Sequence, residues 1–327
     1  MREPAYIRLH REGRLQARAR QAAELLKDCC LCPRRCGVNR RSGETGVCRT
    51  GAKAGIAACH AHFGEEAPLV GRSGSGTIFF SSCSLLCSFC QNFEISHRGE
   101  GEETDPSRLA AIMVRLMRQG CHNVNFVTPT HVVPQILQAL CLAVERGLNI
   151  PLVYNCGGYE AVETLKLLDG VIDIYMPDFK FWDNARAERF CRIRDYRERA
   201  MAAVREMHRQ VGDLVLDESG IAVRGLLVRH LVMPNGAAGT ELVMLFLAES
   251  ISANTYVNVM DQYRPCGHAP GDPLINRRIT AEEYAEAIRS ARRAGLRRLD
   301  NPPCSAMALT PVFCKGNRKN RDRNRDS

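Results

Sequence analysis

Between residues 76 and 295, short apolar runs alternate with longer segments whose apolar positions recur at helical spacing. Strands are predicted for the apolar runs at 77–80, 123–127, 152–155, 172–176, 226–232 and 256–260. Helices are predicted for the amphipathic segments at 106–119, 134–147, 159–169, 196–211, 238–251 and 281–294. Strand–helix units in such succession are typical of a parallel sheet covered by helices, which places the chain in the α/β class. Because the crossovers are right-handed, we expect the sheet to curl into a partial (β/α)6 barrel of the TIM type.

The residues before this repeat predict an N-terminal, cysteine-rich extension over 1–75. Apolar positions at helical spacing predict one amphipathic helix over 5–27, and a turn-rich knuckle with Pro33 and several glycines follows. The knuckle cysteines, spaced C-x2-C-x3-C-x11-C, are Cys29, Cys32, Cys36 and Cys48. We expect a bound metal here rather than spare thiols. Zinc and a second iron–sulfur cluster are both open alternatives.

The barrel pattern covers 76–300, and beyond it the segment 301–327 is basic, polar and low in complexity. A nucleic-acid tail and a disordered, solvated end both fit this composition. No aromatic residue interleaves the charges after residue 315, which favours the disordered end. Although the whole chain carries a formal net charge of +9, we therefore expect no nucleic-acid partner.

The chain contains sixteen cysteines, which is the outlier of its composition. Its first residues are charged and lack the apolar core of a signal peptide, and no apolar run approaches membrane-spanning length. We therefore expect a cytoplasmic protein with no membrane partner. In that reducing compartment the cysteines are expected to do metal or redox work instead of forming disulfides.

A cysteine triplet follows directly after the first predicted strand. Cys83, Cys87 and Cys90 are spaced C-x3-C-x2-C in a loop. Four thiolates usually hold a cubane iron–sulfur cluster. Three thiolates leave one iron with an open position for a small molecule, just as catalytic metal sites keep one coordination position open. The alternative is three cysteines packed as small hydrophobic residues, and the position at a strand end argues against it.

With Phe89 before its last cysteine, this motif resembles the signature of the radical S-adenosylmethionine (radical SAM) superfamily. The resemblance implies that Cys83, Cys87 and Cys90 hold a [4Fe–4S] cluster whose remaining iron binds S-adenosylmethionine. It implies reductive cleavage of that cofactor to a 5′-deoxyadenosyl radical, which abstracts a hydrogen atom from a substrate. The segment around Phe89 is then expected near the adenine. A one-electron donor, a flavodoxin or a ferredoxin, is implied as a partner.

Polar residues at the ends of the predicted strands are further candidates, because the chemistry of such barrels sits there. Candidates for binding the cofactor are Thr128, Thr130, His131, Asn155, Asp178, Lys180, Arg229 and Asn258. The two threonines suit its ammonium and carboxylate, the two asparagines suit the ribose, and Asp178 suits the ammonium or the ribose. Lys180 and Arg229 suit the carboxylate, Arg229 in bidentate fashion. His131 is able to donate to the cofactor or to the substrate.

Cysteines and carboxylates outside these motifs were also considered. Cys156 lies near a predicted strand end and is a candidate hydrogen-atom donor, as is Cys266. Glu65 and Glu66 lie in a loop that is able to face the active site. The scattered cysteines, Cys191 among them, are expected to be packing or surface thiols.

A finer resemblance, over about residues 5–300, is to pyruvate formate-lyase activating enzyme-like radical SAM proteins. The segments that carry it are Leu31-Cys-Pro-Arg-Arg-Cys-Gly-Val-Asn-Arg40, Cys90-Gln-Asn92, Asn125-Phe-Val-Thr-Pro-Thr-His131, Met176-Pro-Asp-Phe-Lys180 and Met260-Asp-Gln-Tyr-Arg-Pro265. Asp178-x-Lys180 resembles a motif of glycyl-radical-enzyme activases. Thr128-Pro-Thr-His131 stands where a Gly-Gly-Glu motif is usual, so the contacts of that motif do not carry over.

Three functions follow from these patterns as alternatives. The first is hydrogen abstraction from a protein substrate, as in glycyl radical formation by an activase. The second is radical SAM modification of a small molecule, a peptide or RNA. The third is a zinc-bound structural or binding protein that uses the clustered cysteines without catalysis.

Overall fold

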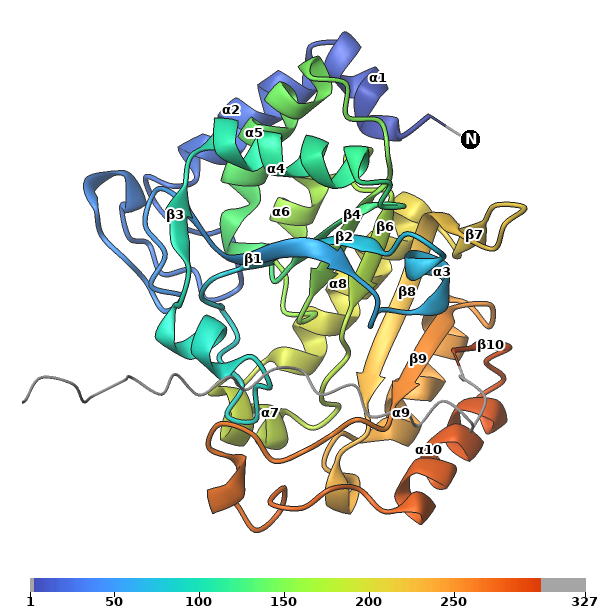
Figure 1. The fold of residues 1–327 in the computed structure, drawn as a ribbon. Helices are drawn as coiled ribbons and strands as arrows, with labels where there is room; N and C mark the ends of the chain where they lie inside the picture. Colours follow the sequence, from blue (N-terminus) through green and yellow to red (C-terminus); the bar gives the residue numbers. More distant parts are fainter. Residues whose placement is uncertain (1–2, 301–327) are drawn as a thin grey trace, which may run out of the picture.

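The predicted strand–helix units form one sheet whose middle is parallel (Figure 1). The computed structural model describes residues 3–300, so the predicted tail 301–327 lies outside the described residues. The parallel strands, in spatial order, are β2 (Ser75–Phe80), β4 (Val124–Val127), β5 (Leu152–Cys156), β6 (Ile174–Pro177), β8 (Ala222–Leu231) and β9 (Tyr256–Met260). β5 and β6 are buried at every position, as expected of parallel strands that are covered on both faces.

Within residues 3–300 the sheet stays open at both edges. β1 (Ala54–His62) and β3 (Glu102–Thr104) continue it beyond β2 as antiparallel strands, and β10 (Arg298–Leu299) adds a short parallel strand beyond β9. β7 (Val215–Leu216) pairs antiparallel with β8, off this path. The architecture is therefore an open, partial α/β barrel, as predicted.

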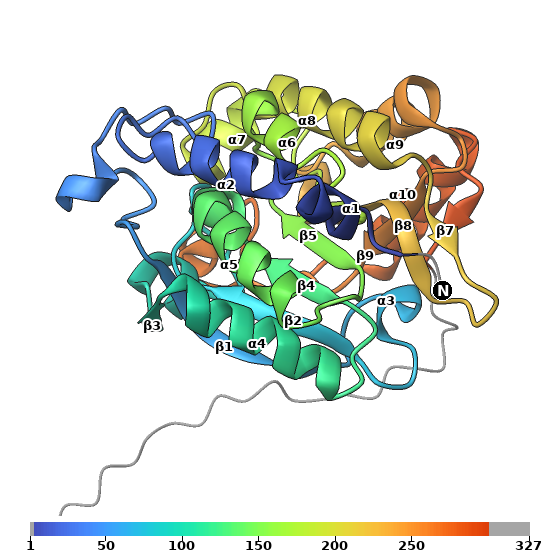
Figure 2. The same cartoon turned by 90° about the horizontal axis from the view of Figure 1, so that it is seen from above.

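Helices surround the strands on the outside of the sheet (Figure 2). Those of the repeat are α4 (Pro106–Arg118), α5 (Val133–Glu145), α6 (Val162–Leu167), α8 (Tyr196–Val211), α9 (Thr240–Phe246) and α10 (Ala281–Arg293). The predicted helix 238–251 is divided between α9 and a π-helical turn, Leu247–Ile251. The other helical elements are α3 (Ala67–Val70), α7 (Asn184–Cys191), and the turns Arg40–Ser42, Glu94–Arg98, Thr130–Val132, Pro234–Gly236 and Ala269–Gly271.

The prediction of one continuous helix over 5–27 is wrong. The structure has two helices there, α1 (Ala5–Arg11) and α2 (Arg14–Glu24). The break falls at Gly13, whose backbone is left-handed with φ +70° and so cannot continue a right-handed helix. The apolar periodicity survives the break because α2 still buries one face, including Leu15, Ala19 and Ala22, and packs on α5.

The knuckle is as rich in turns as its composition predicts. Residues 29–48 contain no strand and one short helical turn, Arg40–Ser42. After the knuckle the chain enters β1, which pairs with β2 in antiparallel register from Ile56↔Phe80 to His62↔Ser75. The same strand that leaves the knuckle thus lies beside the strand that leads into the C-x3-C-x2-C loop.

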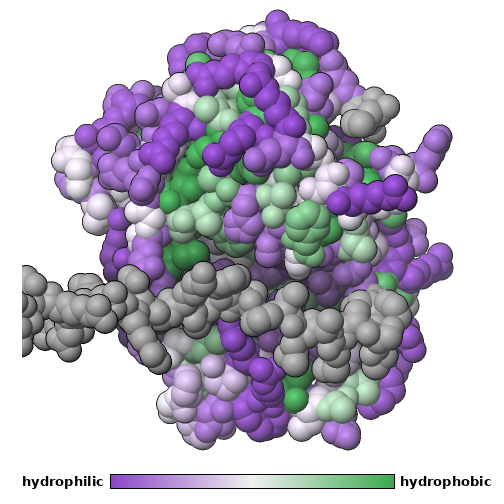
Figure 3. All heavy atoms as spheres, in the orientation of Figure 1, coloured by the Kyte–Doolittle hydropathy of each residue, from purple (hydrophilic) through white to green (hydrophobic). Residues whose placement is uncertain are grey.

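The face of the molecule seen in Figure 1 is hydrophilic at its rims, and apolar side chains gather across its middle, where β1 runs (Figure 3). Among the described residues, no helix is both long enough and apolar enough to cross a bilayer. All cysteines in that part of the chain are free thiols.

Candidate functional site

The C-x3-C-x2-C loop begins immediately after β2 ends at Phe80. Its backbone is unusual, because the non-glycine residues Ser82 and Leu86 take left-handed conformations with φ +71° and +53°. Such conformations are disfavoured for residues with a side chain and cluster at functional sites. They lie directly before Cys83 and Cys87, so the loop is bent where two of the three cysteines must turn inward.

The Cys87 side chain is buried, those of Cys83 and Cys90 are half-buried, and the three thiols lie close enough to affect one another. Burial, together with the neighbouring Cys87 and Cys90, raises the pKa of Cys83 to about 12. The Leu85 N–H donates to the Cys83 sulfur at 3.3 Å, and the Ser96 hydroxyl donates to the Cys90 sulfur at 3.2 Å. These donors favour a thiolate, the form in which cysteine binds iron.

These three thiols are not grouped as a site for a single metal ion in residues 3–300. In the part of the chain that the structure describes, no three cysteine, histidine or carboxylate side chains lie close enough together to hold one metal ion. Sulfurs 2.3 Å from one zinc ion lie roughly 3.8 Å apart, close to contact. A cubane of iron and sulfide is larger and keeps its thiolate ligands farther apart.

Lys180 brings a positive charge to this loop. It follows β6, and its ammonium pairs with the Asp178 carboxylate at 2.5 Å. The thiol of Cys191, 3.4 Å from the Cys87 sulfur, raises the pKa of Cys87, burial raises it further, and the Lys180 ammonium opposes both. The predicted Asp-x-Lys pair is thus placed beside the predicted cluster cysteines.

A glycine at the end of β5 permits this close approach. A Cβ atom on Gly157 would lie 2.9 Å from the Leu85 side chain and 3.6 Å from Cε of Lys180. A side chain at this position would press on Leu85 in the cysteine loop and would come into van der Waals contact with Lys180. The ends of β2, β5 and β6 therefore meet at one place, as expected for the carboxyl edge of a parallel barrel.

Cys191 was predicted to be a packing or surface thiol, and the structure buries it at the end of α7 against Cys87. Its neighbourhood is fixed by backbone contacts, because the Ser88 N–H donates to the Phe190 carbonyl at 2.8 Å. No local motif marks this residue, since 104 positions separate it from Cys87.

Glu160 is a second buried group that the sequence patterns did not single out. Its carboxylate accepts hydrogen bonds from Thr130 Oγ1 at 2.6 Å and from the Tyr154 hydroxyl at 2.9 Å. Burial raises the pKa of Glu160 to about 7, although these bonds and one from Cys156 oppose the shift. Thr130 and Cys156, predicted to face the cofactor or substrate, are both engaged with this carboxyl group.

Arg229 was predicted to bind the cofactor carboxylate and is instead held by two glutamates. Its guanidinium bonds both oxygens of Glu66 at 2.6 Å and also contacts Glu65. The amide of Asn258, predicted for the ribose, donates to the same Glu66 at 2.7 Å. Glu65 and Glu66 thus face the barrel interior, and a cofactor carboxylate at Arg229 has to compete with them.

The remaining candidates for binding the cofactor, Thr128, Asn155 and Phe89, differ in their surroundings. Thr128 has φ +60° and donates its N–H to the Asn155 carbonyl at 2.8 Å. The Asn155 amide makes no side-chain hydrogen bond among the described residues, which leaves it available to a ligand. Phe89 is buried in an aromatic cluster, with its ring centroid 5.8 Å from that of Phe181. It anchors the end of the cysteine loop to the barrel.

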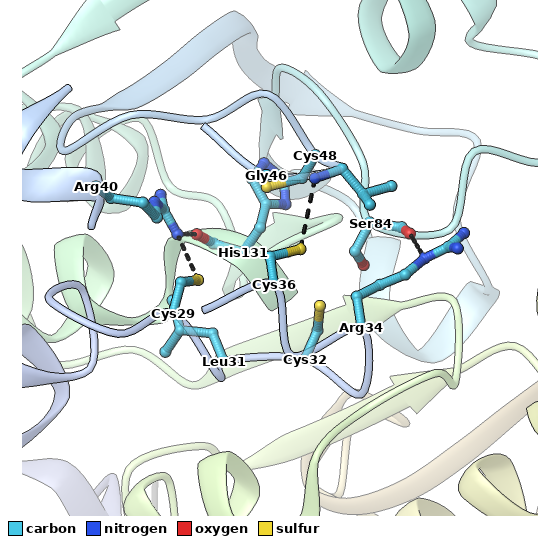
Figure 4. Close-up of a pocket in the computed structure, with 11 residues that line it drawn as sticks. Cys29, Leu31, Cys32, Arg34, Cys36, Arg40, Gly46, Cys48, Ser84 and His131 are labelled. Carbon is cyan, nitrogen blue, oxygen red and sulfur yellow. Dashed lines mark hydrogen bonds between the residues drawn. The ribbon is translucent and has the colours of Figure 1, made fainter. Parts of the chain in front are cut away.

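His131 faces the knuckle (Figure 4). Its Nε2 donates to the Ser81 carbonyl at 2.8 Å, and its own carbonyl accepts from Arg40 at 2.8 Å. The ring lines a pocket whose other members include the knuckle cysteines Cys29, Cys32, Cys36 and Cys48. This placement puts it beside the second cysteine group and not beside the predicted cofactor-binding residues of β5 and β6.

Arg34 joins the knuckle to the C-x3-C-x2-C loop. It lies between Cys32 and Cys36 in sequence, and its guanidinium donates to the Ser84 carbonyl at 3.1 Å and to the Leu85 carbonyl at 3.4 Å. It also donates to the carbonyls of Cys191 and Arg192, each at 3.0 Å. The two cysteine groups of the sequence are therefore neighbours in space.

Comparison with known proteins identifies the superfamily. Residues 77–218, which include the cysteine triplet and Lys180, match the radical SAM superfamily. The chain is 36% identical over 285 residues to the Methanocaldococcus jannaschii protein named "Uncharacterized protein MJ0674", with 84% of this chain and 77% of that protein aligned. The crystal structure of methylornithine synthase (PylB) aligns with 76% of this chain and 78% of its own, at 14% identity and a TM-score of 0.43. On its sequence motif and the family match over residues 77–218, the chain contains a radical SAM superfamily domain, and members of that superfamily bind a [4Fe–4S] cluster and S-adenosylmethionine.

Proposed function

We propose that this radical SAM enzyme acts on a protein substrate, by abstracting a hydrogen atom from a backbone Cα position as a glycyl radical activase does. The observation that carries the proposal is the Asp178–Lys180 pair, which resembles the activase motif and lies beside the cluster cysteines. When bound, the cluster and S-adenosylmethionine supply a one-electron cleavage that yields a carbon radical.

The residues present fit those two groups. Cys83, Cys87 and Cys90 are the three thiol ligands of the cluster, and hydrogen bonds from Leu85 and Ser96 support two of them as thiolates. The buried Lys180 ammonium offsets part of their negative charge. The strand-end groups then hold the cofactor, with Asp178 toward its ammonium and Asn155 toward its ribose.

Part of the cysteine loop is packed away from water. Phe89 is almost fully buried and packs edge-on against Phe181 and Phe190. A dry site protects a reactive carbon radical from side reactions. Cys156 is a candidate for returning a hydrogen atom to a substrate, although its thiol interacts with Glu160.

The first experiment tests the chemistry. After anaerobic reconstitution and reduction, the protein should form 5′-deoxyadenosine from S-adenosylmethionine, whereas Cys83→Ala should form none. Cys141→Ala, which changes a partly buried cysteine on α5, is the matched control and should keep full activity. A wild-type protein that binds zinc alone and forms no product contradicts the proposal and supports the scaffold alternative.

The second experiment tests the substrate class. Cells of the source organism are grown on glycine dideuterated at Cα, and their extract is separated by size into protein and small-molecule fractions. The protein fraction should transfer deuterium to 5′-deoxyadenosine, measured by mass spectrometry, and should acquire a glycyl radical signal in electron paramagnetic resonance. Transfer from the small-molecule fraction alone contradicts the activase role and favours a small-molecule substrate.

An electron must also reach the cluster from outside. We propose a flavodoxin or a ferredoxin as the donor, because each delivers one electron at a time. Either protein, supplied in reduced form, should replace the chemical reductant in the cleavage assay. Failure of both contradicts this partner assignment without affecting the assignment of the cluster cysteines.

A further inference from the structure

We propose that the knuckle pocket binds a second iron–sulfur cluster, held by Cys29, Cys32, Cys36 and Cys48. These cysteines come from three separate turns, yet their side chains surround one small hollow (Figure 4). The approach depends on Gly46, because a Cβ atom there would lie 2.6 Å from the Cys36 sulfur. The Val47 N–H also donates to that sulfur at 3.5 Å, as backbone amides do to cluster ligands.

An unsatisfied imidazole nitrogen points to a missing occupant. His131 is almost fully buried, and its ring borders the hollow. Because a carbonyl oxygen only accepts, Nε2 must carry the hydrogen that bonds Ser81, which leaves a lone pair on Nδ1. Nδ1 has no partner within the described residues. A buried lone pair of this kind is normally completed by a water or a metal ion, so the ring marks a place for a bound group without choosing between a cluster and zinc.

A buried positive charge gives a second, independent indication. The Arg40 side chain is 1% exposed and bonds the carbonyls of Gly51 and His131. In residues 3–300 no carboxylate lies within salt-bridge distance of it, and its Nη1 is 4.0 Å from the Cys29 sulfur. A buried cation is costly without a counter-charge. Metal-bound thiolates carry that charge, whereas neutral thiols do not.

The size of the hollow favours a cluster over zinc. It admits a water-sized sphere between the side chains that line it. Four sulfurs around one zinc ion lie nearly in contact and leave no such space. The absence of any single-ion grouping among the described residues agrees with this difference. A cubane cluster, whose thiolate ligands stand farther apart, fits the arrangement.

The second cluster would lie next to the first. Ser84 lines the knuckle pocket and belongs to the loop between Cys83 and Cys87. Arg34 ties the two loops together through the carbonyls of Ser84 and Leu85. The knuckle pocket and the C-x3-C-x2-C loop are therefore direct neighbours.

The test removes each cysteine group in turn and counts metal. Anaerobically reconstituted wild-type protein should hold about eight iron and eight sulfide per chain. The variant Cys83→Ala/Cys87→Ala/Cys90→Ala should hold about four of each, keep the absorption and Mössbauer signature of a [4Fe–4S] cluster, and form no 5′-deoxyadenosine. The variant Cys32→Ser/Cys36→Ser/Cys48→Ser should lose the iron and sulfide of the knuckle, about four of each, and keep those of the C-x3-C-x2-C loop.

The first of these variants keeps the knuckle intact, so the proposal is testable even if the knuckle variant fails to fold. If the first variant contains no iron, or one zinc ion, the proposal is overturned. Wild-type protein that holds about four iron and still cleaves S-adenosylmethionine overturns the second cluster while leaving the proposed function standing. The matched control Cys121→Ala, far from both groups in the sequence, should retain all eight iron.

Discussion

The two cysteine groups of this protein are neighbours in space, but they are assembled in different ways. Cys83, Cys87 and Cys90 share one short loop that starts at the end of β2, so local spacing brings their sulfurs together. The knuckle cysteines span 29–48 without a strand, and the half-buried Arg34 and the buried Arg40 position the turns that carry them. A catalytic loop is thus anchored by the sheet, whereas the knuckle is anchored by side chains that reach backbone carbonyls.

The largest expected effect is on the cleavage activity, which should differ between variants of the two cysteine groups. Cys87→Ala should abolish formation of 5′-deoxyadenosine, because a cluster ligand is lost. Cys48→Ala should leave measurable cleavage and lower the melting temperature more than Cys87→Ala does, since the knuckle turns lose their common ligand. The amount of 5′-deoxyadenosine and the melting temperature, measured on the same samples, compare the two variants. Equal loss of activity in both variants contradicts the division of roles.

The link between the groups is tested by Arg34→Leu. The substitution removes hydrogen bonds to four carbonyls on two loops, so we expect a loss of about 2 kcal/mol in unfolding free energy and lower iron content. Arg35→Leu is the matched control, because Arg35 makes one exposed ion pair, with Glu163 at 3.4 Å. If the two variants have equal stability and iron content, Arg34 does not couple the loops.

A further effect on stability is expected from the buried carboxyl group of Glu160. Burial raises the pKa of Glu160 to about 7 from an ordinary value of 4.5. Between these pH values the folded protein binds more protons than the unfolded chain, so its stability falls as pH rises from about 4.5 to 7.

Glu160→Gln should remove that fall, by about 2 to 3 kcal/mol, in urea unfolding of the metal-free protein at pH 5 and pH 8. Glu163→Gln, an exposed glutamate on α6, is the matched control and should keep the wild-type pH dependence. An unchanged difference between the two pH values in Glu160→Gln contradicts the assignment.

The smallest effect is expected at Cys191. Its thiol contacts the Cys87 sulfur at 3.4 Å, but it lies outside the C-x3-C-x2-C spacing. Cys191→Ala should therefore keep the full iron content and change the rate of cleavage by less than about threefold, as the loss of one neutral hydrogen bond does. A loss of about four iron would instead make Cys191 a cluster ligand.

The sequence predicted the parallel strands and the cysteine loop well, because both depend on local pattern. Each predicted strand coincides with an observed one, and the bounds of α8 and β9 were reproduced. It failed for α1 and α2, where the periodicity continues across Gly13 although the helix does not. It also could not show that β1 pairs with β2, which joins the N-terminal segment to the sheet.

Local sequence patterns could likewise predict only part of the candidate site. Spacing located Cys83, Cys87 and Cys90, and a motif located Asp178 and Lys180. Spacing could not reveal that Arg229 is held by Glu65 and Glu66, which are more than 160 positions away. Nor could it place His131 at the knuckle, since a single histidine after a strand has no preferred direction.

The order of residues by itself determined the superfamily, the succession of strands and helices, and which cysteines share a loop. These features rest on periodicity and short-range spacing, and each is complete within a few neighbouring residues. Only the tertiary structure decided that the knuckle lies against the cysteine loop, that Cys191 meets Cys87, and that Glu160 is buried against Thr130 and Tyr154. Those contacts join segments far apart in the chain, and burial and charge pairing in the folded protein select them.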